Sequence, residues 1–431
     1  MNISRLVEKK TGGGAHTPEE IAHLVDAYTR GGIPDREMTR WLKAVFDHGM
    51  TDEETLAVVD GMMASGERVD FSFLDRFVAD KHSTGGVGDK VSLVLAPLMA
   101  SAGLAIPMIT GRSLGHTGGT CDKLESIPGY RTNLSMDEFV RVVEDVGASI
   151  IGQTDWICPA DRKIYALRDA TGTIASTPLI CGSIMSKKIA EGIQGLVLDI
   201  KVGSGAFMKT LDDARKLGEK LIMVGRHFGV STEAVYSDMN QPLGYEVGLW
   251  NEVEESVRAL RGKGPDDLMD LTFRLGSILL IQARLVQSED EARALQTALI
   301  SSGKALETFL DMVQAHGGDT SDLEEPSGGH LRATFSRTVT APRGGFLVLC
   351  DTLELGRAAK ELTVFVRGKA RAVDPTGGIR LHKKLGEEVK AGDELAVCFG
   401  EDRERVEGAF TRTASAFTIG EELPKPPVLT Y

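Results

Sequence analysis

The sequence of 431 residues is poor in aromatic side chains and has no pattern of a disulfide-held, zinc-bound or membrane protein. Aromatic residues make up 6% of it, and its five cysteines are scattered without a CxxC pair. That spacing excludes a disulfide framework and a zinc cage. No apolar run approaches the ~18 residues of a membrane span, and the first residues have no charged segment followed by an apolar stretch. We therefore expect a cytoplasmic protein.

An excess of positive charge is also absent. The 62 acidic residues outnumber the 49 basic ones, and the formal net charge is −13. A protein that neutralises nucleic-acid phosphates in bulk needs the opposite balance, so we expect no nucleic acid as a partner. A local basic pocket for one small anion is still compatible with this charge. Because single cores stop growing at roughly 250 to 300 residues, we expect more than one domain.

The first 66 residues have the pattern of three short amphipathic helices. Two of these helices begin with a capping box, at Thr17 with Glu20 and at Thr51 with Glu54, and apolar residues then recur at helical spacing. So short a segment with so many apolar faces cannot enclose a core alone. We expect it to pack on another helical piece or on a second subunit.

From about residue 70, short apolar runs alternate with helices, which predicts an α/β sheet domain. Buried strands are expected at 104–109, 196–202 and 234–239. A capped amphipathic helix is expected at 135–146.

After about residue 330 the helical patterns fade and β-branched runs take over, for example at 362–366 and 378–381. The fold class is therefore α/β. We expect a helical domain at 1–66, a central α/β domain at 70–330 and a β-rich α/β domain at 335–431.

The segment 80–90, DKHSTGGVGDK, places lysines, hydroxyls and three glycines in front of the apolar run 91–98. Glycines let backbone N–H groups approach an anion closely, and hydroxyls donate to phosphate oxygens. The order of residues matches neither a Walker loop nor GxGxxG. The segment predicts an anion cradle, and the plain alternative is a glycine turn with a cluster of surface charges.

A second segment of this kind, TGRSLGHTGGT at 110–120, begins where the strand expected at 104–109 ends. Ligands of α/β proteins bind at that end of parallel strands. Two hydroxyl-rich glycine loops at strand ends indicate one phosphate held from two sides. His116 is ambiguous, since a lone histidine in a glycine loop is more often a structural hydrogen-bonding group than a catalyst.

A third cluster consists of Arg168, Ser183 and Lys187. The i,i+4 spacing of the last two, in a helix expected at about 177–192, puts a hydroxyl and an ammonium on one face. Lys188 and Glu191 are then assigned to the solvent side. Such donors suit carbonyl oxygens or an anionic leaving group. Taken alone, the cluster is equally typical of solvated helix faces.

Five long runs of the sequence closely resemble the thymidine phosphorylase and pyrimidine-nucleoside phosphorylase family. They are KHSTGGVGD (81–89), GHTGGT (115–120), DKLESIPG (122–129), YALRD (165–169) and KVGSGAFM (201–208). The resemblance covers nearly the whole chain. It implies a two-lobed nucleoside phosphorylase fold, in which about 160–192 completes a small all-helical domain beside a large α/β domain and a C-terminal β-rich appendage.

The resemblance also implies the reaction, which is reversible phosphorolysis of a pyrimidine nucleoside. The products would be the free base and, from thymidine or deoxyuridine, 2-deoxy-α-D-ribose 1-phosphate. Inorganic phosphate would be the co-substrate, with no other cofactor, and the N-terminal helices would form a homodimer.

The roles that the resemblance implies divide the candidate residues into three sets. Phosphate would be held by Lys81, Ser83, Ser92, Thr110 and Thr120. The base would be held by Arg168, Ser183 and Lys187. The catalytic set would be His82, Arg168 and Lys187, with His82 near base O2 and the glycosidic bond.

The sequence departs from the family pattern in the second glycine loop and before it. Thr110 and Ser113 stand where the family more often has serine and glycine, so phosphate affinity is expected to differ. Met108 stands where members that use uridine freely often carry lysine. We therefore expect thymidine to be preferred, and the alternative is a broad pyrimidine-nucleoside phosphorylase that also uses uridine.

A third departure concerns a monovalent cation that some relatives bind. Its ligands would be backbone oxygens at Gly88, Leu243 and Glu246, the Glu255 carboxylate and a hydroxyl at position 90, where this sequence has Lys90. We expect the Lys90 ammonium to replace the ion and no metal to be required.

Two rival interpretations remain open on the sequence. A distant phosphoribosyltransferase, such as the anthranilate enzyme, shares the two-lobed architecture but would need magnesium and a pyrophosphate site. A non-catalytic nucleoside-binding protein could use the same fold. The set Arg168, Ser183 and Lys187 favours the phosphorylase over the first rival.

Overall fold

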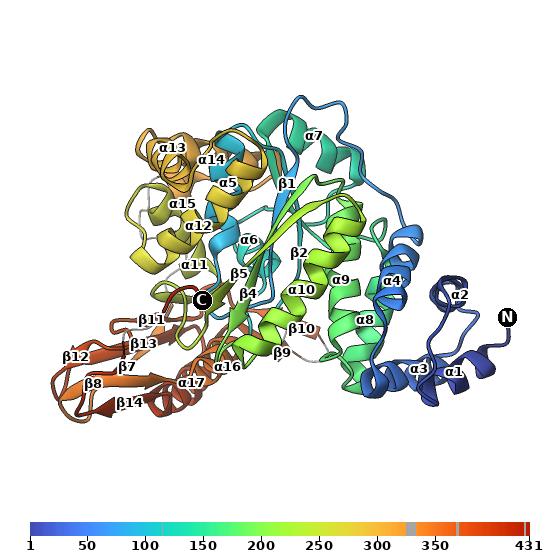
Figure 1. The fold of residues 1–431 in the computed structure, drawn as a ribbon. Helices are drawn as coiled ribbons and strands as arrows, with labels where there is room; N and C mark the ends of the chain where they lie inside the picture. Colours follow the sequence, from blue (N-terminus) through green and yellow to red (C-terminus); the bar gives the residue numbers. More distant parts are fainter. Residues whose placement is uncertain (114, 325–332, 368–369, 426–427) are drawn as a thin grey trace.

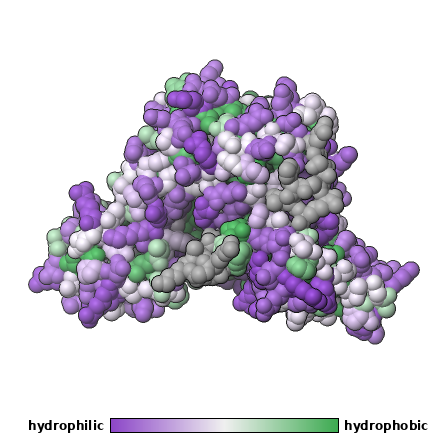
Figure 2. Space-filling view, turned by 180° about the vertical axis from the view of Figure 1, so that it is seen from behind, coloured by the Kyte–Doolittle hydropathy of each residue, from purple (hydrophilic) through white to green (hydrophobic). Residues whose placement is uncertain are grey.

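The computed structural model describes residues 1–113, 115–324, 333–367, 370–425 and 428–431. Figure 1 shows three regions side by side: a group of N-terminal helices, a central sheet with helices on both faces, and a C-terminal region of smaller sheets. The face seen in Figure 2 is mostly hydrophilic, with hydrophobic residues in small separate patches. Within the described residues, no helix has the length and apolar character needed to cross a membrane.

The central sheet is parallel, with the strand order β5–β4–β1–β2–β3. Its strands are β1 (Ala79–Ser83), β2 (Ile106–Thr110), β3 (Ala148–Gly152), β4 (Gly195–Val202) and β5 (Ser231–Asp238). β4 pairs with β1 and β5, β2 pairs with β3, and a bridge from Val78 to Ala105 joins β1 to β2. The three strands expected from the sequence are confirmed as β2, β4 and β5, with small shifts at their ends.

Side chains that alternate along β4 divide between two cores, because successive residues of a strand point to opposite faces. Val197 packs in one core and Leu196 and Leu198 pack in the other. The first core takes residues from α5 (Val91–Ser101), α11 (Trp250–Leu260), α12 (Asp266–Gln282), α13 (Glu289–Ser301), α14 (Lys304–Ala315) and α15 (Ser321–Glu324). The second takes residues from α7 (Met136–Val146), α9 (Thr177–Ala190) and α10 (Leu211–His227). The sheet is therefore covered on both faces, as Figure 1 shows.

The N-terminal region contains four helices rather than the three predicted. They are α1 (Ile3–Thr11), α2 (Pro18–Thr29), α3 (Asp35–His48) and α4 (Asp52–Ala64). The capping boxes of α2 and α4 are confirmed. The prediction missed α1, which buries only Leu6, Val7 and Lys10 and so has a weak apolar stripe.

Helix α8 (Pro159–Thr171) and the beginning of α9 pack against these four helices. Ala160, Ile164 and Leu179 are buried in one cluster with Trp41 and Leu42 of α3. The N-terminal helices thus find their core in a segment about a hundred residues further along the chain. We propose that the segment at about 160–192 completes the helical domain of residues 1–66.

The C-terminal region contains two helices beside its strands, although the helical patterns in the sequence fade after about residue 330. They are α16 (Thr352–Thr363) and α17 (Arg403–Ser415), and residues 362 and 363 end α16 instead of starting a strand. The buried stripe of α16 is Leu355, Ala358, Ala359 and Leu362, which has helical spacing but only two large side chains. Its apolar signal in the sequence is correspondingly weak.

The strands of this region form three small sheets. One has the order β6–β11–β13–β7, with β6 (Glu246–Gly248), β7 (Phe335–Thr340), β11 (Gly378–Leu381) and β13 (Glu394–Gly400). The second consists of β12 (Glu388–Val389), β8 (Gly345–Cys350) and β14 (Phe417–Gly420), and the third of β9 (Val364–Arg367) and β10 (Ala370–Val373). The strand predicted at 378–381 is confirmed as β11. Because β6 belongs to the central region and pairs with β11, the first sheet connects the two regions.

The packing of α8 on the N-terminal helices predicts a stability effect. Ile164→Ala, at a site that is 1% exposed, should lower the free energy of unfolding by about 2 to 5 kcal/mol, through lost apolar burial and the cavity left behind. Urea denaturation followed by circular dichroism measures it. Leu285→Ala, at a site that is 50% exposed, is the matched control and should change stability by about 0.5 kcal/mol or less. Equal effects of the two substitutions would contradict the packing described.

Candidate active site

The side chains expected to hold phosphate come from segments that meet at one edge of the central sheet. Lys81 and Ser83 lie on β1, Thr110 ends β2, Ser92 lies in the first turn of α5, and Thr120 begins α6 (Thr120–Leu124). β1 and β2 are neighbouring parallel strands, so their carboxyl ends reach the same edge. The two glycine loops also approach each other, since a Cβ placed on Gly85 would lie 3.5 Å from the side chain of Thr117.

A buried carboxylate, Asp89, organises the first glycine loop. Ser83 Oγ donates to Asp89 Oδ2 at 2.5 Å, and Lys123 Nζ donates to the Asp89 carbonyl at 2.7 Å. Burial alone would raise the pKa of Asp89, but the ammonium groups of Lys201 and Lys81 hold that pKa well below its usual range. The carboxylate is therefore ionised and fixed at neutral pH.

Lys81 is buried with its ammonium group only loosely engaged. Its Nζ lies 3.7 Å from Asp89 Oδ1 and 3.7 Å from Asp199 Oδ2, whereas Lys201 Nζ approaches Asp199 Oδ2 to 2.7 Å. Among the described residues Lys81 Nζ makes these two ion pairs and no hydrogen bond. Its N–H donors are thus available to an anion at the strand ends.

The second glycine loop is held by Asp122 and by close backbone contacts. Ser113 N donates to Asp122 Oδ2 at 2.7 Å, and Arg112 donates to Asp122 Oδ1 at 3.1 Å. A Cβ on Gly119 would lie 2.2 Å from Ser113 N, so that position needs glycine. Ser113 therefore fits the loop through its backbone, although the family pattern more often has glycine there.

His116 has a structural contact of the kind that the plain interpretation expected. Its Nε2 must donate the 2.8 Å hydrogen bond to the Gly205 carbonyl, because a carbonyl only accepts. The ring also lies beside Phe207, with centroids 5.7 Å apart. Burial lowers the pKa of His116 below its ordinary value, which favours the neutral ring.

The cluster expected to hold the base lies on α8 and α9. Lys187 Nζ donates to Ser183 Oγ at 3.2 Å, to the Ser183 carbonyl and to Asp161 Oδ2. The shared face of residues 183 and 187 is therefore confirmed. The prediction missed Asp161, whose only signal was its place seven residues before Arg168 on α8, two helical turns along the same face.

Arg168 is almost completely buried and holds the connection between α8 and α9. Its guanidinium donates to the Leu179 carbonyl at 3.0 Å and to the Ile174 carbonyl at 2.6 Å. Its Nε, also buried, has no acceptor among the described residues. Burial lowers the pKa of Arg168 from its ordinary value. One donor of this side chain thus remains unpaired.

The assignment of Lys188 and Glu191 to the solvent side was wrong. Lys188 is 1% exposed and Glu191 is 0% exposed. Lys188 Nζ donates to Asp80 Oδ2 on β1, to the Ile109 carbonyl on β2 at 2.9 Å and to Glu191 Oε1 at 2.8 Å. The physical reason is that α9 has buried residues on all its faces, since it lies between the helical cluster and the sheet.

His82 lies where the two groups of side chains meet. It is half-buried on β1, and its pKa is well below the ordinary value because of burial and of the positive charges of Lys188, Lys187 and Lys81. Those charges come from α9 on one side and from β1 on the other. The imidazole is therefore neutral at neutral pH and able to donate a hydrogen bond.

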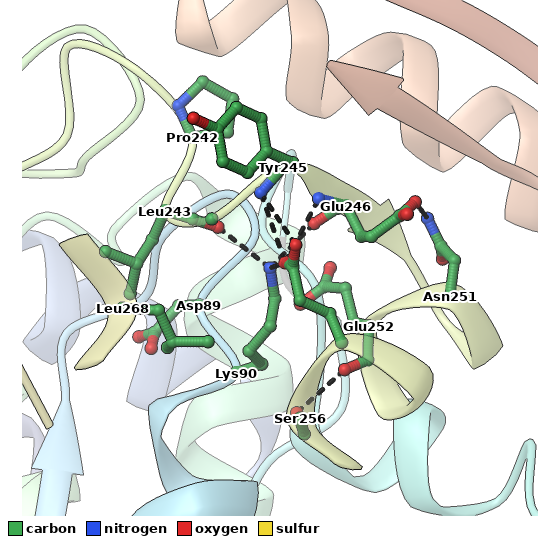
Figure 3. Close-up of polar contacts among 12 residues, drawn as sticks. Asp89, Lys90, Pro242, Leu243, Tyr245, Glu246, Asn251, Glu252, Ser256 and Leu268 are labelled. Atoms are coloured by element: carbon green, nitrogen blue, oxygen red, sulfur yellow. Dashed lines mark hydrogen bonds and ion pairs between the residues drawn. The ribbon is translucent and has the colours of Figure 1, made fainter. Parts of the chain in front are cut away.

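Lys90 is buried among the residues that the sequence assigned to a cation site, and its ammonium group contacts their oxygens (Figure 3). Its Nζ donates to the carbonyls of Leu243 and Glu246 at 2.8 Å each and to Glu255 Oε2 at 2.6 Å. Burial disfavours the ammonium, but the negative charges of Glu255 and Glu252 raise the pKa of Lys90 above its ordinary value. Gly88 is part of the same site, since a Cβ there would lie 2.6 Å from the Leu243 carbonyl.

The chain combines a helical bundle with a parallel sheet that is covered on both faces and has polar glycine loops at its strand ends. Buried lysines lie where the two parts meet. This architecture is that of a two-lobed glycosyl transferase. Family models support this in three parts of the chain. They are the glycosyl transferase family helical bundle domain at 4–66, the glycosyl transferase family a/b domain at 75–306, and the pyrimidine nucleoside phosphorylase C-terminal domain at 346–420.

Comparison with the sequences of known proteins identifies the family more closely. The pyrimidine-nucleoside phosphorylase of Geobacillus stearothermophilus is 41% identical over 431 residues, with 100% of this chain and 99% of the relative covered. The enzyme of the same name from Bacillus subtilis (strain 168) is 41% identical over 429 residues with the same coverage. The chain belongs to the pyrimidine-nucleoside phosphorylase family and is a pentosyltransferase.

A solved structure shows the fold independently. Anthranilate phosphoribosyltransferase from Thermus thermophilus matches with a TM-score of 0.57 and 17% sequence identity, over 72% of this chain and 99% of that one. At this identity the likeness concerns the fold alone. The expected fold class is thereby confirmed.

The Lys90 site predicts how activity responds to monovalent cations. The reaction rate should be the same in potassium chloride and in choline chloride at equal ionic strength, because the ammonium already binds the three acceptors. Lys90→Ser leaves the buried Glu255 without its partner, which should cost about 3 to 5 kcal/mol of stability in choline chloride. Potassium chloride should recover part of that loss in melting temperature. Activity of the unaltered protein that depends on potassium would contradict this account.

Proposed function

We propose that the protein catalyses reversible phosphorolysis of pyrimidine nucleosides, with inorganic phosphate as co-substrate and no other cofactor. The observation that carries the proposal is the position of His82. This histidine follows Lys81 on β1, the strand that α9 reaches through the bond from Lys188 to Asp80, and burial together with the charges of Lys188, Lys187 and Lys81 depresses its pKa. A phosphate at Lys81 and a base at Lys187 would meet beside it.

Phosphate binds at the strand ends in this proposal. Lys81 offers donors that make no hydrogen bond to the described residues, and Ser83 offers a hydroxyl already oriented by Asp89. Ser92, Thr110 and Thr120 complete the donor set from α5, β2 and α6. Hydroxyl and ammonium donors together suit the three oxygens of inorganic phosphate that remain when the fourth attacks C1′.

The base binds between α8 and α9, to Arg168, Ser183 and Lys187, through its O2, N3 and O4 edge. All three N–H donors of the Lys187 ammonium are engaged, by Asp161 and by two oxygens of Ser183. Base binding therefore exchanges one of these contacts for a carbonyl oxygen. The unpaired Nε of Arg168 is a further donor at this place.

The chemistry follows from the charge that develops as the bond between C1′ and N1 breaks. The sugar becomes oxocarbenium-like and the base accumulates negative charge on its carbonyl oxygens. Donors on those oxygens stabilise the transition state more than the ground state. Since phosphate carries the negative charge that attacks C1′, no nucleophilic side chain and no pair of carboxylates is needed. His82, neutral at neutral pH, acts by donating a hydrogen bond to base O2.

The proposed sugar preference is for thymidine and deoxyuridine, which give 2-deoxy-α-D-ribose 1-phosphate. It rests on Met108, which lies on β2, is 1% exposed and packs in the core shared with α5. This apolar side chain places no charge near the strand end, where a ribose 2′-hydroxyl would need a polar partner. Equal kcat/KM values for uridine and thymidine would contradict this preference and identify a broad pyrimidine-nucleoside phosphorylase.

A single assay tests the reaction and its residues. Purified protein is incubated with thymidine or uridine, with and without phosphate, and free base is measured by chromatography. Lys187→Ala should lower kcat by about 10²- to 10³-fold, because it removes a donor to the developing charge. His82→Ala should lower kcat by about 10-fold, the value of one net hydrogen bond.

The exposed Lys216, whose side chain is 74% exposed, provides the matched control. Lys216→Ala should have unaltered rates. Base released without phosphate would identify a hydrolase. No base released under any condition would favour a non-catalytic nucleoside-binding protein. Full activity of Lys187→Ala would reject the assigned base site.

We also propose that the protein is a homodimer that associates through its N-terminal helices. Helix α3 carries Phe46, a large apolar side chain that is 45% exposed in the single chain. Light scattering at micromolar protein should give twice the 46.4 kDa of the chain, and Phe46→Glu should lower the measured mass. A mass of one chain for the unaltered protein would contradict the proposal.

A further inference from the structure

Helix α16 of the C-terminal region reaches the glycine loops at the strand ends of the central sheet. We propose that α16 positions the second glycine loop, residues 111–113 and 115–119, for phosphate, and that Lys360 and Gly356 are the positioning residues. The inference rests on the phosphate site proposed above. It gives the C-terminal region a role in the reaction without placing any of its side chains on a substrate.

The first observation is a hydrogen bond between the two regions. Lys360 Nζ, on the exposed side of α16, donates to the Gly115 carbonyl at 2.8 Å. The donor and the acceptor are 245 residues apart in the chain. A charged donor on a rigid helix thus fixes a carbonyl in the middle of a loop that contains four glycines and whose described residues form neither helix nor strand.

The second observation is the close approach of the helix backbone at Gly356. A Cβ placed on Gly356 would lie 2.5 Å from the His116 carbonyl and 2.8 Å from the side chain of Val87. A real Cβ atom does not tolerate the first of these distances. The helix therefore touches both glycine loops at one residue, and only glycine allows it.

The third observation is at the first turn of α16, which contacts a further glycine turn at the end of β4. Thr352 N donates to Ser204 Oγ at 3.3 Å, and a Cβ on Gly205 would lie 2.4 Å from the Thr352 side chain. Gly205 in turn accepts the hydrogen bond from His116. The helix is thus held at its first turn by the same part of the sheet edge that holds the loop.

A small opening lies beside these contacts, between the second glycine loop and α16. It is lined by Ser113, Thr117 and Val247 on the central side and by Lys360 and Thr363 on α16. His116 and Thr117 therefore border open space beside α16. Loss of the Lys360 contact leaves this part of the loop room to move away from the first glycine loop.

The effect should concern phosphate and not the base. The loop begins after Thr110 and ends at Thr120, which are both proposed phosphate donors, whereas no hydrogen bond or ion pair found among the described residues joins α8 or α9 to α16. A looser loop raises the conformational cost of phosphate binding. It leaves the donors of Lys187 and Ser183 where they are.

The experiment compares Lys360→Met with Arg357→Met in the full-length protein. Both substitutions remove one positive charge from the exposed side of α16, but Arg357 pairs with Glu354 on its own helix and not with the loop. We expect Lys360→Met to raise the KM for phosphate by about 3- to 10-fold, the range of one net hydrogen bond, with the KM for thymidine unchanged. Hydrogen exchange of the amides of residues 115–119 should become faster in this variant alone.

Gly356→Ala gives a second test at the same contact. The added methyl group must displace the His116 carbonyl, so the KM for phosphate should rise at least as much as in Lys360→Met. Circular dichroism and a melting curve verify that the variant is folded, and Lys360→Met carries the test if it is not.

Three outcomes would overturn the inference. They are a phosphate KM of Lys360→Met equal to that of Arg357→Met, an equal rise in the KM for thymidine, and unchanged amide exchange in the loop. These outcomes are separable from failure of the proposed function. If the unaltered protein releases base without phosphate, the proposed reaction is wrong. If it needs phosphate and Lys360→Met behaves as the control, only the role of α16 is wrong.

Discussion

The structure depends on the pairing of lysine ammonium groups that are buried far from water. Lys90 is the clearest case, because its one Nζ atom connects the start of α5 with two carbonyls of the 243–246 segment and with Glu255 of α11. An unpaired ammonium in such a place would cost several kcal/mol. The chain can therefore bury Lys90 only if these three segments are held in one geometry. Glu246 extends the same constraint to the C-terminal region, since Arg380 of β11 donates to its carboxylate at 2.6 Å.

Two further buried lysines join separate segments of the chain in the same way, next to the glycine loops. Lys188 ties α9 to β1 and β2, and Lys123 ties α6 to α11 through Glu252 at 2.6 Å. Lys188 has three protein acceptors, and Lys123 donates to the Asp89 carbonyl and pairs with Glu252. Lys81 differs from them, because its nearest carboxylate oxygens are 3.7 Å away. In the phosphate site that we propose, fixed charges thus surround a donor with no close partner, which is the arrangement that electrostatic stabilisation of a reaction requires.

The same network decides the state of His82. Burial and the positive charges of Lys188, Lys187 and Lys81 lower the pKa of His82 and favour its neutral form, so that the ring can donate a hydrogen bond in the reaction that we propose. The C-terminal region supports the central sheet and its glycine loops through direct contacts. It pairs a strand with β6, and α16 lies against both glycine loops through Gly356. Helices α9 and α16, which belong to different regions, thus both contact the strands and loops at this edge of the sheet.

Local patterns in the sequence predicted a part of the elements and gave the candidate residues. The capping boxes of α2, α4 and α7, the strands β2, β4, β5 and β11 and the shared face of Ser183 and Lys187 were all found from spacing alone, because each depends on residues close in the chain. Helices α1 and α16 were missed because their buried stripes contain few large side chains.

The pairing of charges could not be read from the sequence. Lys188 and Glu191 were assigned to solvent because a helix with one buried face was assumed. Asp161 was missed because its ion-pair partner, Lys187, lies on another helix. Lys90 and Glu255 are 165 residues apart, and Lys188 and Asp80 are 108 apart. The sequence by itself determined the strongly amphipathic helices, several strands and the polar glycine loops. Only the tertiary structure decided which charges are neutralised and which donors stay open, because an ion pair depends on the distance between segments and not on their spacing in the chain.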